Sequence, residues 1–134
     1  MFRSRLLLAF PALLLSVLPA SSLTLECKIP PSNAGGGWIT ELYVLQLDES
    51  SGQAIISDGW IMEYNDEQPM VARVAENTAK KLVLRWDLKM ALQGKTTTMQ
   101  YRASYFKADG TITIRAVPGG YSNDFEGRGR CKEL

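Results

Sequence analysis

Apolar and polar residues alternate along most of the chain beyond position 22, and turn residues interrupt the alternation about every eight to twelve positions. A period of two is typical of strands with one face in a core and the other in water, and stripes with a helical period do not occur. The pattern is clearest in residues 81–90, where every second residue is Leu, Trp or Met. It predicts strands over residues 24–29, 38–48, 53–57, 60–64, 70–75, 81–90, 96–106 and 111–117.

Two turn sequences predict hairpins. The Asp-Gly pair at 58–59 is the dipeptide most typical of a tight hairpin, and Ala-Asp-Gly at 108–110 is a second candidate. Each is expected to join the predicted strands on its two sides. The tail over residues 118–130 is rich in glycine and is predicted to be irregular, ending in a short segment around Cys131 that can pair as a last, partial strand.

The start of the chain predicts an export signal over residues 1–22. Two arginines precede an apolar run, residues 6–18, which is shorter than the roughly 20 residues that span a bilayer. Small residues allow cleavage after Ala20 or Ser22. We therefore expect a periplasmic or secreted monomer without a membrane span, built as a single β domain over residues 23–134.

Two cysteines, Cys27 and Cys131, bear on how the strands close. An exported chain with an even cysteine count most often pairs them, which predicts a disulfide between the first strand and the end of the chain. Short turns make successive strands antiparallel neighbours. The fold class predicted is all-β: a meander of about eight antiparallel strands that forms a small barrel or a nearly closed sandwich.

The interior of such a barrel is narrow. Eight strands enclose a space only just wide enough for side chains or one small ligand. Large residues are predicted to face inward and to fill it. They are Leu82, Leu84, Trp86, Leu88, Tyr101 and Tyr105.

Composition predicts neither catalysis nor a nucleic-acid partner. The chain has no histidine, and both cysteines are expected in the disulfide, so the commonest general base and a thiolate nucleophile are missing. Two cysteines alone do not make a zinc site, and no metal or other cofactor is expected. Thirteen basic and fourteen acidic residues, interspersed in sign, follow the predicted signal. We therefore expect no attraction to nucleic acid or to an anionic membrane.

Carboxylates are the remaining acid–base candidates. Most of them fall in predicted turns or on polar strand faces, where we expect solvated surface rather than catalysis. The candidates considered are Asp58, Glu63, Asp66, Asp87, Asp124 and Glu126.

The glycine-rich segment 35–38 ends in Trp38 and precedes a predicted strand rather than a helix, so it does not fit a phosphate-binding loop. Its Gly-Gly-Trp resembles the Gly-x-Trp with which lipocalin-type barrels begin. That resemblance implies that Trp38 plugs one end of the barrel. It also implies that Arg128 or Arg130 packs as a cation on the tryptophan face.

The segment 118–127 is the strongest candidate for a binding loop. It is long for a hairpin connection and combines two aromatic residues with glycines and polar groups, a composition that suits protein recognition. The alternative is that its aromatic residues merely cover the open edge of the barrel. The candidate binding residues are Tyr121, Asn123, Asp124 and Phe125.

Taken whole, the chain resembles an uncharacterised family of small exported Gram-negative bacterial proteins, a likeness that implies no activity. The residues that carry it are the leader, Cys27, Gly35-Gly36-Gly37-Trp38, Ser57-Asp58-Gly59, Gly119-Gly120-Tyr121-Ser122-Asn123 and Gly129-Arg130-Cys131.

A fainter likeness is to the periplasmic barrel inhibitors of secreted metalloproteases, which thread a free N-terminus into the protease cleft. Cleavage after Ala20 would leave Ser21-Ser22-Leu23 as such a terminus. The predicted disulfide at Cys27 departs from that pattern, because it would restrict how far the arm reaches.

These observations lead to an exported, non-catalytic binding module that recognises a protein or an envelope component. The alternatives are a small apolar-ligand carrier of the lipocalin type and a periplasmic protease inhibitor. An enzyme that works with carboxylates comes last.

Overall fold

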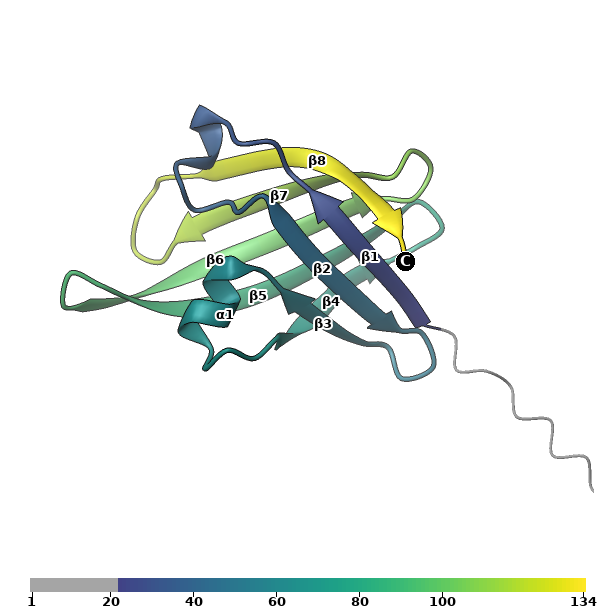
Figure 1. The fold of residues 1–134 in the computed structure, drawn as a ribbon, viewed down its shortest axis with the longest axis horizontal. Coiled ribbons are helices and arrows are strands. Elements are labelled where there is room, and N and C mark those ends of the chain that lie inside the picture. Colours follow the sequence, from purple (N-terminus) through teal and green to yellow (C-terminus); the bar gives the residue numbers. More distant parts are fainter. Residues whose placement is uncertain (1–21) are drawn as a thin grey trace, which may run out of the picture.

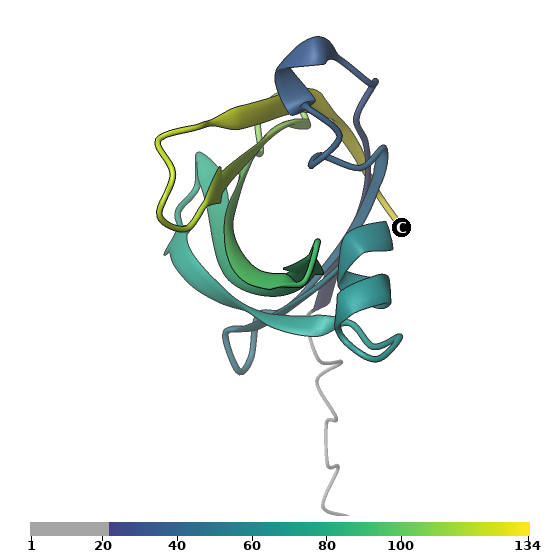
Figure 2. The same cartoon turned by 90° about the vertical axis from the view of Figure 1, so that its left-hand side faces the viewer.

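The computed structural model describes residues 22–134 as a closed antiparallel barrel of eight strands. The strands follow one another around the barrel in chain order, and the last pairs with the first (Figures 1 and 2). The predicted meander is confirmed, and of its two forms the barrel is found. Apart from Ser22, the predicted export signal lies outside the described residues. The strands are β1 Ser22–Lys28, β2 Leu42–Asp48, β3 Gln53–Ser57, β4 Met70–Asn77, β5 Lys81–Leu92, β6 Lys95–Phe106, β7 Thr111–Pro118 and β8 Phe125–Glu133.

The barrel interior holds a single apolar core. Trp86 of β5 and Tyr101 of β6 stack in parallel with ring centroids 5.3 Å apart, and Tyr43 of β2 lies 6.3 Å from Trp86. Leucine, isoleucine and methionine side chains from the other strands surround these rings. The six residues predicted to face inward all belong to this core, with Tyr105 at its margin.

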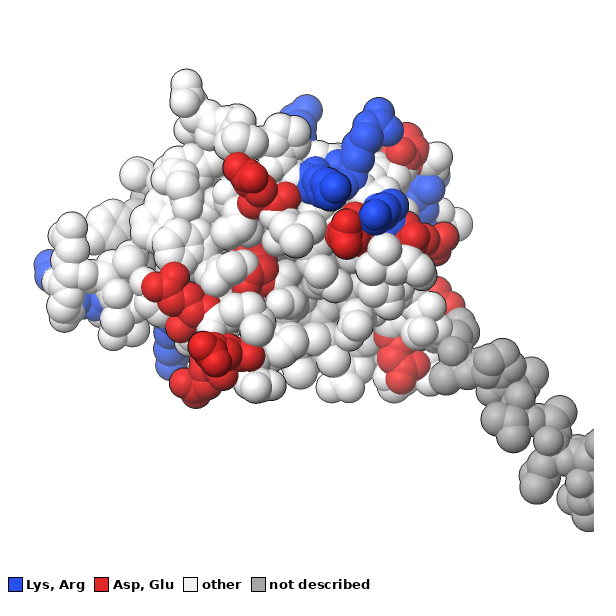
Figure 3. Space-filling model, viewed as in Figure 1, with Lys and Arg blue, Asp and Glu red and all other residues white. Residues whose placement is uncertain are grey.

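The predicted disulfide closes the barrel. Cys27 of β1 and Cys131 of β8 stand directly opposite each other in the strand pairing and are bonded. This seam has only four residue pairs, whereas β5 and β6 share twelve. The bridge therefore lies where the backbone ladder is short. Over the same seam, basic and acidic side chains mix on the surface (Figure 3), and Lys132 lies 3.5 Å from Glu26.

The predicted strand over residues 60–64 is wrong, because this segment forms the helix α1, Gly59–Tyr64. Asp58 is the N-cap of the helix rather than part of a hairpin turn, and its carboxylate accepts a hydrogen bond from the Ile61 amide at 2.8 Å. The helical turn places Trp60 and Tyr64 on one face and buries Ile61 completely. No helix within residues 22–134 is long and apolar enough to cross a bilayer.

The predicted irregular tail is also wrong over much of its length. Residues 125–133 form the full strand β8, which pairs with both β7 and β1. The count of eight strands is thus correct, although one predicted strand is a helix and the tail supplies the eighth. The strand predicted to start at Trp38 begins instead at Leu42, and a short 3₁₀-helix, η1, spans Asn33–Gly35.

Candidate functional site

The candidate site lies at one end of the barrel, the end that faces the viewer in Figure 2. Three segments far apart in sequence meet there: the connection between β1 and β2 that contains η1, the tip of the β5–β6 hairpin, and the loop between β7 and β8. Helix α1 lies beside them, because its Trp60 ring is 6.1 Å from the ring of Trp38. This end is called the mouth below.

Trp38 is fixed at the mouth from several sides. Its carbonyl oxygen accepts a hydrogen bond of 3.0 Å from the hydroxyl of Tyr101, a core residue. Its ring is half-buried against Trp60 and Phe125, whose ring centroid is 6.3 Å away. Trp60 in turn donates its indole N–H to the carbonyl of Gly37 at 3.1 Å. Trp38 therefore packs over one end of the core, the position that a plug occupies.

Phe125, the first residue of β8, packs directly on the glycine-rich connection. Gly36 has a φ of +57°, and a Cβ at this position would lie 2.5 Å from the Phe125 ring. A glycine suits this position for two reasons: it adopts the left-handed backbone conformation easily, and it leaves room for the Phe125 ring. Its absent side chain lets the β7–β8 loop and the η1 connection meet.

These contacts leave an open pocket of about 490 Å³ at the mouth. It is lined by aromatic and other apolar side chains together with a few polar groups, and Tyr121 on its wall is 64% exposed. We call this cavity the mouth pocket. Its lining residues are Trp38, Leu92, Gln93, Lys95, Thr97, Met99, Pro118, Tyr121, Asn123 and Phe125.

Three of the four predicted loop residues line this pocket, and the fourth does not. Asp124 turns outward and forms a bidentate ion pair with Arg115 of β7, whose Nε lies 3.0 Å from both carboxylate oxygens. The hydrogen bonds from Arg115 hold the pKa of Asp124 below its usual value. Asp124 thus ties the loop to the outside of the barrel.

Neither predicted arginine reaches Trp38. Arg128 donates to Glu126 at 3.1 Å, and Arg130 donates to the carbonyl of Asp109 at 3.4 Å. Within residues 22–134 the ring neighbours of Trp38 are Trp60 and Phe125. The Gly-Gly-Trp sequence also follows β1, whereas lipocalin-type barrels begin with it.

The part of the pocket wall contributed by the β5–β6 hairpin was not predicted. Leu92 and Lys95 lie beyond the predicted strands, because β5 extends two residues and β6 one residue further towards the turn than the alternation indicated, whereas Met99 lies within the predicted strand 96–106. The signal that was available is Gln93-Gly94. A two-residue turn of this kind lets both strands continue to its edges.

Asp58 is the one buried charged or polar residue within residues 22–134, whereas the sequence suggested a solvated turn. It is 6% exposed and accepts hydrogen bonds from the Thr40 hydroxyl at 2.6 Å and from the Ile61 amide. Burial raises the pKa of its carboxyl, and the hydrogen bonds from Thr40, Ile61 and Tyr43 oppose that rise. Burial, reinforced by the Asp58 charge, also raises the pKa of Tyr43.

The raised pKa predicts how stability changes with pH. The folded protein binds a proton at Asp58 more tightly than the unfolded chain, so this carboxyl stabilises the fold at low pH and loses that contribution as the pH rises through its folded-state pKa. Asp58→Asn keeps an N-cap acceptor without the titration. From about pH 3 to about pH 7, the unfolding free energy of the Asn variant is expected to rise relative to wild type.

Urea unfolding at several pH values measures this difference. Asp58→Ala is the control, because it removes the cap itself and should cost about 1–2 kcal/mol across the range. A difference between wild type and Asp58→Asn that stays constant with pH would contradict the raised pKa.

The fold and the pocket together define a class: a small antiparallel barrel of eight strands, sealed by a disulfide, with an aromatic pocket at one mouth. Among residues 22–134, no three Asp, Glu or Cys side chains are grouped so as to hold a metal ion. Comparison with known proteins finds no family model, no curated protein and no solved structure that matches the chain.

Proposed function

We propose that this protein is an exported, non-catalytic binding module whose mouth pocket recognises a protein or another component of the cell envelope. The observation that carries the proposal is the meeting of Trp38 with Tyr121, Asn123 and Phe125 in one open pocket. Aromatic residues at the centre of a concave surface provide most of the binding energy in many interfaces. Asn123 and Lys95 add polar groups that can orient a partner.

The disulfide supports export. Disulfides persist in oxidising compartments, and the barrel has one between its first and last strands. The leader-like residues 1–22 point to the same compartment. These two features together support a periplasmic or secreted location.

The two alternative functions have less support. A lipocalin-type carrier holds its ligand inside the barrel, where Tyr43, Trp86 and Tyr101 already occupy the interior here. A protease inhibitor of the threading type needs a free N-terminal arm, but Ser22 and Leu23 are paired with β2 as strand residues.

Tyr121 offers the sharpest test of the proposed site. Its side chain is 64% exposed, so Tyr121→Ala removes a large contact surface without touching the core. We expect this variant to capture its partner from an envelope extract at least about tenfold more weakly than wild type, as loss of an aromatic anchor does. Quantitative cross-linking and mass spectrometry on the immobilised proteins measure the change.

Leu134→Ala is the matched control, because Leu134 is 69% exposed and does not line the mouth pocket. It should capture the same components as wild type. Equal capture by wild type and Tyr121→Ala would rule out the mouth pocket as the binding site.

A further inference from the structure

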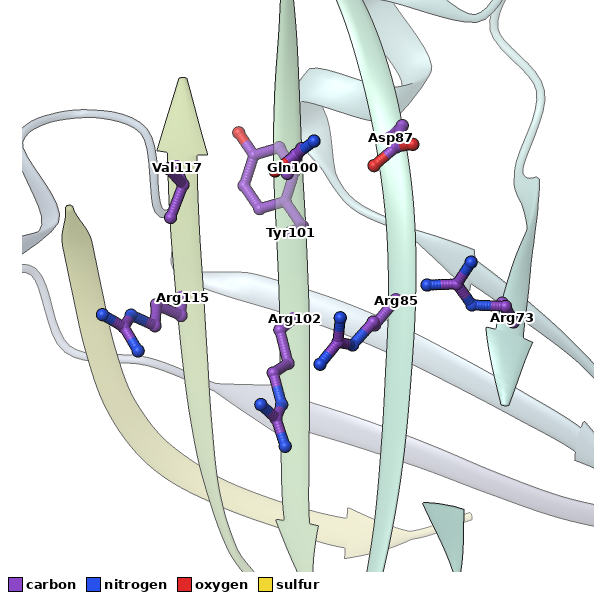
Figure 4. A pocket seen from close by; sticks show the side chains of 8 residues that line it. All are labelled: Arg73, Arg85, Asp87, Gln100, Tyr101, Arg102, Arg115 and Val117. Atoms are coloured by element: carbon purple, nitrogen blue, oxygen red, sulfur yellow. The ribbon is translucent and has the colours of Figure 1, made fainter. Parts of the chain in front are cut away.

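Four arginines form a row across the outer face of the barrel. Arg73 of β4 stands opposite Arg85 of β5, Arg85 opposite Arg102 of β6, and Arg102 opposite Arg115 of β7. Figure 4 shows the four side chains side by side on four neighbouring strands. Because neighbouring strands lie about 4.8 Å apart, the row spans roughly 14 Å. We call it the arginine row.

Most of this positive charge is unbalanced within the protein. Arg115 is paired with Asp124, but the other three arginines make no ion pair and no side-chain hydrogen bond with any residue of the described range 22–134. All four are exposed. Like charges directly opposite each other on neighbouring strands destabilise a sheet, so the row opposes folding rather than assisting it.

The row lies in a hollow of about 510 Å³ on the sheet surface. Beside the arginines, Asp87 and Gln100 stand opposite each other on β5 and β6 and face the same hollow. Guanidinium groups bind oxyanions through paired hydrogen bonds. A carboxylate accepts hydrogen bonds from hydroxyl groups, and an amide side chain can both accept from them and donate to them. The hollow thus combines a line of anion-binding groups with partners for hydroxyls.

From this arrangement we propose that the arginine row binds an acidic polysaccharide of the polyuronate type. Such a chain carries one carboxylate on each sugar, and its sugars also carry hydroxyls. Laid across the strands, it brings carboxylates to the unpaired guanidinium groups of the row while a sugar hydroxyl meets Asp87 or Gln100. This site is separate from the mouth pocket, so the inference does not depend on the proposed function above.

The lining of the hollow favours a sugar polymer over the two other common polyanions. Single-stranded nucleic acid needs exposed aromatic faces for its bases, but the one aromatic residue of the hollow, Tyr101, is 3% exposed and points to the core. An anionic membrane attracts positive charge in general, and Asp87 on the wall of the hollow weakens that attraction.

Arg102→Glu tests the proposal on the full exported protein. The probe is an oligomer of polygalacturonate, measured by titration calorimetry at low and at high salt. Wild type is expected to bind it, more weakly at high salt because salt screens exposed charges. Arg102→Glu should bind at least about tenfold more weakly, because it places a carboxylate opposite those of the sugar chain.

The same variant should be more stable than wild type, since the new carboxylate at position 102 would lie between Arg85 and Arg115. We expect its thermal midpoint to rise by about 3–6 °C. Weaker binding in a more stable protein separates a binding role from a structural one. A lower midpoint would contradict the unfavourable energy assigned to the row.

Arg130→Glu is the matched control. It makes the same change in net charge. It also replaces a pair of like charges, Arg130 and Lys28, with a pair of opposite charges, but this pair lies between β1 and β8, away from the arginine row. Its affinity for the oligomer should stay within about twofold of wild type. The proposal is overturned if wild type does not bind the oligomer, if Arg102→Glu and wild type bind alike, or if vesicles of phosphatidylglycerol or a single-stranded DNA oligonucleotide bind wild type more tightly.

Discussion

Replacing Cys27 and Cys131 together by alanine is expected to lower the unfolding free energy by roughly 4–5 kcal/mol. The bond links residues 104 positions apart, so it removes much of the freedom of the unfolded chain. A loss of this size is a large part of the total stability of about 5–15 kcal/mol that is usual for one domain. Urea unfolding of the oxidised wild type and the double variant measures it.

Reduction of wild type by dithiothreitol is the control, because it breaks the cross-link without changing the composition of the core. Both treatments should shift the urea midpoint in the same direction and by a similar amount. If iodoacetamide modified both cysteines without prior reduction, the bond itself would be disproved. A loss below about 1 kcal/mol would show that the four pairs of the β1–β8 ladder close the barrel unaided.

Gly129→Ala should have the second largest effect, a loss of about 3 kcal/mol in unfolding free energy. A Cβ on residue 129 of β8 would lie 2.0 Å from the carbonyl oxygen of Lys28. Because the obstacle is the backbone of β1, no side-chain rotation relieves the contact. The two strands must separate at the point where they close the barrel.

Gly59→Ala is the matched control for this substitution. A Cβ on Gly59, the first residue of α1, would meet only a methyl group of Thr40 at 3.8 Å. Its stability should stay within about 0.5 kcal/mol of wild type, since alanine suits a helix at least as well as glycine. Equal stability of Gly129→Ala and wild type would mean that β1 and β8 do not approach this closely.

The fold class was predictable because two independent signals, the alternation of apolar and polar residues and the pairing of the two cysteines, both indicate a closed β fold. Period two predicts half-buried strands, and a bond between the two ends excludes an open meander. The error at residues 60–64 has a local cause. Trp60 and Tyr64 are four residues apart, so they would lie on the same face of either a strand or a helix. Only the capping hydrogen bond of Asp58 distinguishes the helix from the strand.

Only the end of β8, around Cys131, was predicted, and its first part was missed because the sequence there contains glycines where strands usually carry β-branched residues. Gly129 is needed for the close approach of β1, and a Cβ on Gly127 would lie 2.7 Å from the side chain of Ile39. Neighbouring segments leave no room for a side chain at these two positions, so the strand carries glycines that are more typical of a loop. Only the assembled barrel reveals the reason.

The arginine row could have been predicted in part. Arg85 and Arg102 are equally distant from the Gln93-Gly94 turn, and Arg102 and Arg115 are equally distant from the turn at 108–109. Folding each hairpin about its turn places these three residues in one line. The net charge of the chain gave no sign of this row, because a chain whose total charge is nearly balanced can still carry several charges of one sign on one face.

The mouth pocket was predictable only as separate parts. Trp38 and the loop residues 121–125 were identified from composition, but nothing in their sequence separation of more than eighty residues predicts contact. The barrel brings them together because β8 returns beside β1, which leads into the η1 connection.

Helix α1 has one more consequence for how the protein behaves at high concentration. The part of β5 beyond Arg85 pairs with β6 on one side but with no strand of the described chain on the other, and α1 contacts β5. A bare strand margin is a template onto which another polypeptide can add. Because α1 packs against this strand, we expect a weaker Asp58 cap to expose more of the margin and to favour self-association.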